Sequence, residues 1–311
     1  MKNDDFIRVG VDLGGTKIEI SVLGEQGECL ARERRSTPSG NYDAILRCVA
    51  ELVKAMDEKF AGENQYCKYI GIATPGALQD GVIKNSNSTC LNGRSFKVDI
   101  ETALNRPVRM SNDANCFALS EAIDGAASGA DSVFGVIIGT GTGSGLVIHQ
   151  KLLSGCNSIA GEWGHNPLPW RTDADNPSYA CYCGQSGCIE TYLSGPGFAR
   201  RYNEVAHTDC SAEQIVQLAQ DGTKLAQIHL MTYQHRLAKS LASVINIFDP
   251  DVIVLGGGMS NIESLYQTVP TLWNEYVFSN SVHTQLLAPK FGDASGVRGA
   301  AWLWPHDDSL F

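Results

Sequence analysis

The sequence predicts two similar α/β domains that face each other across a cleft. The chain has 311 residues, which is enough for two domains of ordinary size. A unit of strand, glycine turn, strand, turn and strand occurs twice, about 125 residues apart, and such a spacing is typical of an internal duplication. Stretches with helical periodicity follow the copies, so each half combines a small sheet with helices.

The first copy of the unit opens the chain. Short apolar runs predict strands over 6–12, 17–23 and 28–35, separated by turns. Residues 42–60 then place apolar side chains on one helical face, from Ile45 and Val49 to Met56 and Phe60. The elements expected next are a strand over 69–74, a short helix over 99–104, a strand over 108–111 and a helix over 115–125.

The second copy begins near residue 132. It predicts strands over 133–138, 144–149 and 151–153, followed by a long helix over 224–248, a strand over 252–255 and a final helix over 296–304. We therefore expect a small N-terminal α/β domain over 1–114, joined by the C-terminal helix of 296–311. A large α/β domain would occupy 115–295.

Composition excludes several classes of function. Apolar residues make up 43% of the chain and charged residues 19%, which rules out disorder as the main state. The formal net charge is −10, and the sequence has no dense cluster of basic residues of the kind that binds nucleic acid or anionic lipid. The uncharged stretch 132–150 is broken by glycines and fits two strands better than a membrane span. The start of the chain shows no export signal, so we expect a cytoplasmic protein.

Three glycine-rich turns follow predicted strands. They are Asp12–Lys17, the alternating glycines of Gly139–Gly145, and the triple Gly256–Gly258. Glycine lets backbone N–H groups approach a phosphate closely, and Thr16 and Lys17 add further donors. Ordinary hairpin turns, with a β-bulge in the second, are the alternative interpretation. Three such turns on equivalent strands favour nucleotide binding.

Two polar residues, Asn112 and Asp113, lie between a predicted strand and a predicted helix. One interpretation makes them an ordinary helix N-cap. The other makes Asp113 a carboxylate held at a strand end, where it would accept the proton of a hydroxyl group. Their position in the sequence does not separate the two.

One histidine and three cysteines are spaced as metal ligands. His165, Cys181, Cys183 and Cys188 form the pattern H-x15-C-x-C-x4-C, and Gly184 and Gly187 allow a tight turn. Three thiolates and an imidazole suit a closed, structural zinc site, whereas buried free cysteines are the alternative. Two glutamates, Glu162 and Glu190, flank these ligands and are candidates for holding sugar hydroxyl groups.

Together these motifs, in this order, resemble the ROK family of sugar kinases and repressors. The resemblance covers nearly the whole chain and implies an actin-like ATPase (ribonuclease-H-like) fold. Local segments at 84–89, 163–170 and 298–305 are most similar to bacterial fructokinases of the manno(fructo)kinase type. The implied reaction is phosphorylation of D-fructose by ATP to give D-fructose 6-phosphate and ADP, with mannose as a possible second substrate. Kinases for glucose, N-acetylglucosamine or N-acetylmannosamine are the alternative.

The resemblance also implies roles for individual residues. Asp113 would be the catalytic base, Mg²⁺ would accompany ATP near Asp12, zinc would be structural, and the protein would form a homodimer. The implied sugar contacts are Gly76, Asn87, Asn112, Asp113, Glu162, His165 and Glu190. The implied ATP and phosphate contacts are Gly10, Val11, Asp12, Leu13, Gly14, Gly15, Thr16, Lys17, Gly139, Thr140, Gly141, Thr142, Gly143, Ser144, Gly145, Leu146, Gly256, Gly257 and Gly258.

Two non-enzymatic hypotheses fit the sequence less well. A repressor of this family would carry a helix-turn-helix before the first strand, and only five residues precede the first predicted strand here. A sugar sensor without activity would lack Asp113 or the phosphate-binding glycines, which are all present.

Overall fold

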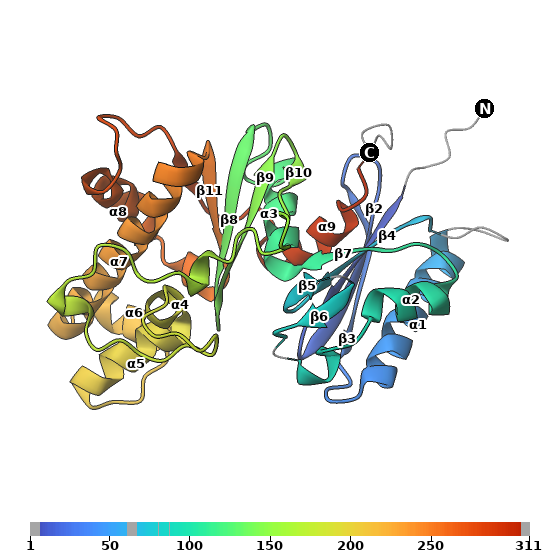
Figure 1. Cartoon of the computed structure of the whole chain (residues 1–311), viewed down its shortest axis with the longest axis horizontal. Coiled ribbons are helices and arrows are strands. Elements are labelled where there is room, and N and C mark those ends of the chain that lie inside the picture. The colour runs from blue at the N-terminus through green and yellow to red at the C-terminus, as the bar shows by residue number, and fades with distance from the viewer. Residues whose placement is uncertain (1–6, 61–66, 80, 87, 306–311) are drawn as a thin grey trace.

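Two five-stranded mixed sheets form the frame of the protein in a computed structural model (Figure 1). The structure describes residues 7–60, 67–79, 81–86 and 88–305. Both sheets have the same order. On one side, the first strand pairs antiparallel with the second, and the second pairs antiparallel with the third; on the other side lie two strands parallel to the first. This repeat confirms the duplication that the sequence predicts.

The N-terminal sheet has the order β3-β2-β1-β4-β7. Its strands are β1 (Arg8–Leu13), β2 (Lys17–Leu23), β3 (Cys29–Ser36), β4 (Tyr69–Thr74) and β7 (Arg109–Asn112). The apolar stripe of α1 (Tyr42–Phe60) packs with α2 (Phe96–Leu104) against the sheet and forms one core. A hairpin of β5 (Ala77–Gln79) and β6 (Val82–Lys84) extends from the end of β4.

The C-terminal sheet has the order β10-β9-β8-β11-β12. Its strands are β8 (Ser132–Ile138), β9 (Thr142–Ile148), β10 (Lys151–Leu152), β11 (Val252–Gly256) and β12 (Gln285–Leu287). The helices that supply most of its core are α4 (Glu190–Leu193), α5 (Gly195–Ala206), α6 (Ala212–Gln220), α7 (Lys224–Phe248) and α8 (Ser264–Leu272). None of the described helices is both long and apolar enough to cross a bilayer.

Two helices, α3 (Asp113–Ile123) and α9 (Ser295–Ala301), lie between the sheets (Figure 1). α9 packs so closely on β1 that a Cβ on Gly10 would come within 1.9 Å of the Val297 carbonyl oxygen. α3 packs equally closely on β8, where a Cβ on Gly135 would meet Ala118 at 2.6 Å. Only glycine permits such contacts between a helix and a strand. α3 and α9 also pack on each other, since a Cβ on Gly299 would come within 1.6 Å of the Cys116 carbonyl oxygen, so α3 is fixed with respect to both sheets.

Several predicted boundaries shift by a few residues. The helix predicted over 115–125 begins at Asp113, because Asn112 caps it, and α2 begins at Phe96 rather than at residue 99. β9 begins at Thr142, so part of the predicted glycine turn is strand. The final helix ends at Ala301 rather than at residue 304. The predicted first strand starts at Phe6, which lies outside the described residues together with 306–311.

Candidate functional site

The turn between β1 and β2 is fixed by hydrogen bonds from two residues that follow β3. The Gly14 N–H donates to the Lys17 carbonyl at 3.0 Å, which closes the turn. The Thr37 hydroxyl donates to the Gly14 carbonyl at 2.7 Å, and the Ser39 hydroxyl donates to the Gly15 carbonyl at 3.0 Å. These bonds fix the peptide planes at the tip of the turn, which is the property that a backbone phosphate site needs.

The turn between β8 and β9 is tied to the helices of the C-terminal half. Strand pairing runs without a register shift up to the pair Ile138–Thr142, so the β-bulge considered from the sequence is wrong. The Gly139 carbonyl accepts the Gly195 N–H at the start of α5, at 2.9 Å. The Thr142 N–H donates to Glu190 Oε2, also at 2.9 Å, and a Cβ on Gly141 would meet that same oxygen. A side chain at residue 141 would therefore displace the Glu190 carboxylate from the Thr142 N–H.

Side chains in this second turn hold a neighbouring loop. The Ser144 hydroxyl donates to the Gly161 carbonyl, and the buried Thr142 side chain lies against Gly164. The sequence predicts Thr142 and Ser144 as phosphate contacts. The Ser144 hydroxyl is bound to the loop of residues 161–165 instead, whereas the buried Thr142 hydroxyl has no hydrogen-bond partner among the residues that the structure describes.

The third glycine segment adjoins the second. Gly257 has a φ of +78°, and a Cβ there would meet the Ile138 carbonyl, one residue before the Gly139 turn. Gly256 is required by packing against the Phe117 ring, whereas Gly258 has open space around it. The segment continues into the 3₁₀ turn Gly258–Asn261 and then α8, rather than directly into an α-helix.

The first turn of α3 brings the two halves of the site together. Asn112 is the N-cap, because its Oδ1 accepts the Asn115 N–H at 2.8 Å. Asp113 is therefore the first helical residue and not the cap. On one side Ala114 lies against Gly143 of the second turn, and on the other the charge of Asp113 acts on Asp12 of β1.

Asp113 is accessible to solvent as a residue, although protein surrounds its carboxylate. More than a third of the residue is accessible, and Oδ1 accepts the Ala114 N–H at 2.8 Å. The surrounding protein raises the pKa of Asp113, and the charge of Glu162 raises it further, although the backbone hydrogen bonds oppose this. A carboxyl group with a raised pKa is a better proton acceptor than an ordinary one.

Asp12 is a second carboxylate whose pKa is raised. Desolvation, and then the charges of Asp113 and Glu19, raise the pKa of Asp12 to about 7, whereas Lys17 lowers it. Glu19 pairs with Asp12 across β1 and β2 and is itself held by Arg32 and Arg34. A half-buried carboxylate beside other carboxylates favours a cation, so Asp12 suits a role near Mg²⁺.

Glu162 and His165 flank a buried anchor. Trp163 between them lies in the C-terminal core, with its ring edge-on to Phe134 and its Nε1–H donating to the Ser240 carbonyl at 3.2 Å. Gly161, with a φ of +91°, lies against the Ser144 carbonyl. Because Trp163 is fixed in the C-terminal core, the side chains of Glu162 and His165 lie at the surface of the loop.

The four predicted zinc ligands converge. Single ligand atoms of His165, Cys181, Cys183 and Cys188 all lie within 4.8 Å of one another. His165 Nδ1 is 3.5 Å from Cys181 Sγ, and Cys183 Sγ is 3.6 Å from Cys188 Sγ. Tetrahedral zinc, with bonds of about 2.3 Å to sulfur and about 2.0 Å to nitrogen, places ligand atoms roughly 3.5–3.8 Å apart. The donor set therefore fits zinc.

The loop between the ligands is fixed by a buried ion cluster that the sequence did not predict. Gly184 and Gly187 have positive φ values of +91° and +74°, as the tight turn requires. Within the intervening loop, Asp175 accepts hydrogen bonds from Arg236 at 2.9 Å and Lys239 at 2.7 Å, both on α7. Burial alone would raise the pKa of Asp175, but the two cations outweigh this effect and lower that pKa to about 2. Asp175 therefore anchors the loop to α7 independently of a metal.

The remaining predicted residues fall into two groups. Gly76 lies against Ser86, and Ser88 lies beside Gly15, so the segment around the β5–β6 hairpin adjoins the first turn. Asn87 lies outside the described residues. Residues placed away from a ligand are Gly10, which α9 covers, Val11 and Leu13, which are in the core, and Leu146, which packs against the other core.

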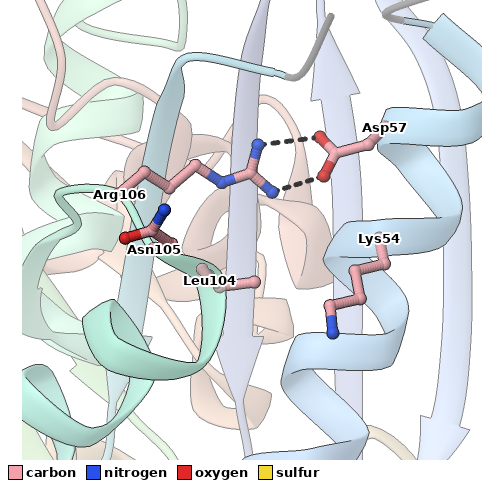
Figure 2. A pocket seen from close by; sticks show the side chains of 5 residues that line it. All are labelled: Lys54, Asp57, Leu104, Asn105 and Arg106. Atoms are coloured by element: carbon pink, nitrogen blue, oxygen red, sulfur yellow. Dashed lines mark hydrogen bonds and ion pairs between the residues drawn. The ribbon is translucent and has the colours of Figure 1, made fainter. Parts of the chain in front are cut away.

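Two surface hollows lie apart from these residues. One of about 200 Å³ is lined by Lys54, Asp57, Leu104, Asn105 and Arg106, and Figure 2 shows the ion pair of Arg106 with Asp57 that spans it. Asp57 also accepts the Cys67 N–H at 2.9 Å, so the pair serves to fix the α2–β7 connection to α1. A second hollow of about 460 Å³ lies between α6, α7 and α8.

Comparison with known proteins gives consistent relatives. Residues 8–307 match the ROK family. An N-acetyl-D-glucosamine kinase from Photobacterium profundum is 39% identical over 300 residues, which cover 94% of this chain and 98% of the relative. An N-acetylgalactosamine kinase from a Shewanella species is 39% identical over 297 residues, covering 94% and 95%.

A solved structure supports the fold. A ROK family glucokinase from Streptomyces griseus, in complex with glucose and AMPPNP, matches with a TM-score of 0.76 at 27% identity, covering 97% of this chain and 100% of that one. The predicted actin-like ATPase fold is confirmed. The predicted fructokinase subtype is not confirmed, since the relatives above are named for N-acetylhexosamines and glucose.

Proposed function

The chain belongs to the ROK family, and on that basis we propose that it is a kinase that transfers the γ-phosphoryl group of ATP to a hydroxyl group of an N-acetylhexosamine. N-acetylglucosamine is the first candidate, because a relative with that activity in its name aligns over 94% of the chain. The observation that supports the proposal is the start of α3, where the charge of Asp113 acts on Asp12 and the next residue, Ala114, lies against Gly143 of the second glycine turn. Fructose, expected from local sequence similarity, becomes the alternative substrate.

The proposed reaction needs alignment and charge stabilisation from the protein. The Asp113 carboxylate accepts the proton of the sugar hydroxyl as its oxygen attacks the γ-phosphorus and the bond to ADP breaks. Backbone N–H groups of the first and second glycine turns hold the phosphates. Mg²⁺, when bound, neutralises phosphate charge, and Asp12 is the residue that would hold it, through water.

Sugar hydroxyl groups would be bound by residues around the start of α3 and the loop of residues 161–165. Asn112 keeps its amide N–H groups for this purpose, since its Oδ1 caps α3. Glu190 binds the Thr142 N–H through Oε2, so Oε1 remains the oxygen directed at a ligand or at Cys181, 3.9 Å away. Glu162, His165 and Gly76 complete the proposed sugar site.

Zinc would have a structural role. His165 Nδ1 and the three thiolates would hold it, which fixes the His165 ring beside the sugar site. Metal affinity would then contribute to folding of this loop.

A coupled assay of ADP release tests the function. The purified protein would be given ATP with N-acetylglucosamine, N-acetylgalactosamine, N-acetylmannosamine, glucose, mannose and fructose in turn. We expect the highest kcat/KM with N-acetylglucosamine. A higher value with fructose would restore the fructokinase hypothesis, and no sugar-dependent ADP release with any member would overturn the proposal.

We also keep two organisational predictions as proposals. Residues 1–114 would form one domain with the C-terminal helix and residues 115–295 the other, which the separate cores of the two sheets support. A homodimer would be detected as a mass of about twice the chain mass by light scattering.

A further inference from the structure

Tyr182 lies at the predicted zinc site, and most of its surface is exposed. It lies between two predicted zinc ligands, Cys181 and Cys183, and 71% of it is exposed. Its ring meets the His165 ring edge-on at a centroid distance of 5.0 Å. An exposed aromatic side chain gains little free energy from burial, so the contact with His165 contributes to holding the ring in place.

The Tyr182 hydroxyl lies next to Nε2 of His165, the ring nitrogen that faces away from the cysteines. His165 Nε2 is 2.9 Å from the Tyr182 hydroxyl oxygen, whereas Nδ1 faces Cys181. When Nδ1 binds a metal it carries no proton, so Nε2 carries the proton and donates it to the hydroxyl oxygen. A single N–H has room for one good acceptor.

The same hydroxyl is close to the proposed sugar contacts. His165 is itself one of these proposed contacts, and Glu190, another, has its Oε1 3.9 Å from the Sγ of Cys181, the residue before Tyr182. The Tyr182 hydroxyl therefore occupies a donor, the His165 Nε2–H, that the proposed sugar site would use.

We propose that the Tyr182 hydroxyl stands in for a sugar hydroxyl at His165 Nε2, and that a bound sugar displaces it. This rests on the proposed function, because it assigns His165 to the sugar site. Tyr182 then sets sugar affinity: it competes with the sugar for one N–H donor and so weakens sugar binding. Since the side chain is mostly exposed, it leaves without disturbing a core.

Calorimetry of sugar binding, without ATP, tests the competition. We would compare the zinc-loaded wild type with Tyr182→Phe, which keeps the ring and removes only the hydroxyl, using N-acetylglucosamine and the other sugars of the assay panel. Loss of one competing hydrogen bond should tighten binding by about twofold to tenfold. Tyr179→Phe is the matched control, because the Tyr179 hydroxyl binds Glu204 instead and its loss should leave affinity unchanged.

A second measurement follows the donor itself. In protein with ¹⁵N-labelled histidine, the Nε2–H resonance of His165 should move when sugar is added to the wild type, and also when Tyr182 becomes Phe without sugar. Zinc content should be the same in wild type and Tyr182→Phe.

Each contrary result has a distinct meaning. Unchanged or weaker binding by Tyr182→Phe, with normal binding by the wild type, would overturn the competition alone. Loss of zinc in Tyr182→Phe would also overturn it, since the hydroxyl would then serve the metal site. A wild type that binds none of the sugars would overturn the proposed function and this inference with it.

Discussion

Replacing Asp12 by Asn should stabilise the ligand-free protein at high pH while it removes activity. The folded state raises the pKa of Asp12 to about 7, from an ordinary value of 3.8. Folding therefore favours the protonated form, and stability falls as pH rises from about 4 to about 7, because the unfolded chain ionises first. A shift of about 3 units corresponds to about 4 kcal/mol as an upper bound. Because Asp12 is only half-buried and is coupled to Asp113, about 2 kcal/mol is the realistic size.

Thermal unfolding at pH 5 and pH 8, without Mg²⁺ and nucleotide, measures this effect. We expect Asp12→Asn to melt near the wild type at pH 5 and about 4–8 °C higher at pH 8. Asp293→Asn is the control: its carboxylate is close to Lys17 but 88% exposed, and its loss should change neither curve by much. Destabilisation at pH 8, or an equal gain at both pH values, would refute the electrostatic reasoning.

Two further variants test other parts of the site. Cys183→Ser should lose zinc, measured by metal analysis, and should melt at a lower temperature, since metal binding contributes to folding; full zinc retention would contradict the ligand assignment. Gly141→Val should raise the KM for ATP, because a branched side chain in the turn would keep phosphate oxygens away from the backbone N–H groups; a smaller rise in the KM for sugar is expected, because the new Cβ would meet Glu190 Oε2 at 2.9 Å. Unchanged nucleotide binding by calorimetry would leave the turn as a hairpin without a role in binding phosphate.

The sequence predicts the frame well because each strand and helix carries its own apolar periodicity. The duplicated unit predicts two sheets of the same order, and the spacing of His165 and the cysteines predicts a cluster that the structure assembles. In both cases the signal lies within a short segment. Turn glycines are likewise visible in the sequence, although the sequence does not tell which neighbour requires them.

Contacts between distant segments were not predictable. The bond from the Thr142 N–H to Glu190 spans 48 residues, and the ion pairs of Asp175 with Arg236 and Lys239 span 61 and 64. No local pattern marks such pairs. A helix signature did exist for Asn112, a good N-cap residue, but Asn and Asp are equivalent caps by propensity, so only the structure separated Asn112 from Asp113.

One of the three segments on which the predicted subtype depended serves packing. Residues 298–305, which resemble fructokinases, form the end of α9 and the chain after it. There Arg298 pairs with Asp124, and the Trp304 Nε1–H donates to the Ile70 carbonyl. The first contact joins α9 to the end of α3, the second joins the chain after α9 to β4, and neither involves a proposed sugar contact. Similarity in this segment therefore reports the packing of α9 rather than the choice of sugar.

The proposed role of Asp113 is tested most directly by the rate of Asp113→Asn on the best sugar of the panel. The helix cap is Asn112, so this variant should melt like the wild type and bind sugar with similar affinity. Loss of a positioned base should lower kcat at least ~10²-fold. Asp131→Asn, which changes an 83% exposed carboxylate paired with His149, should keep full activity. A folded Asp113→Asn protein with near wild-type kcat would contradict the account.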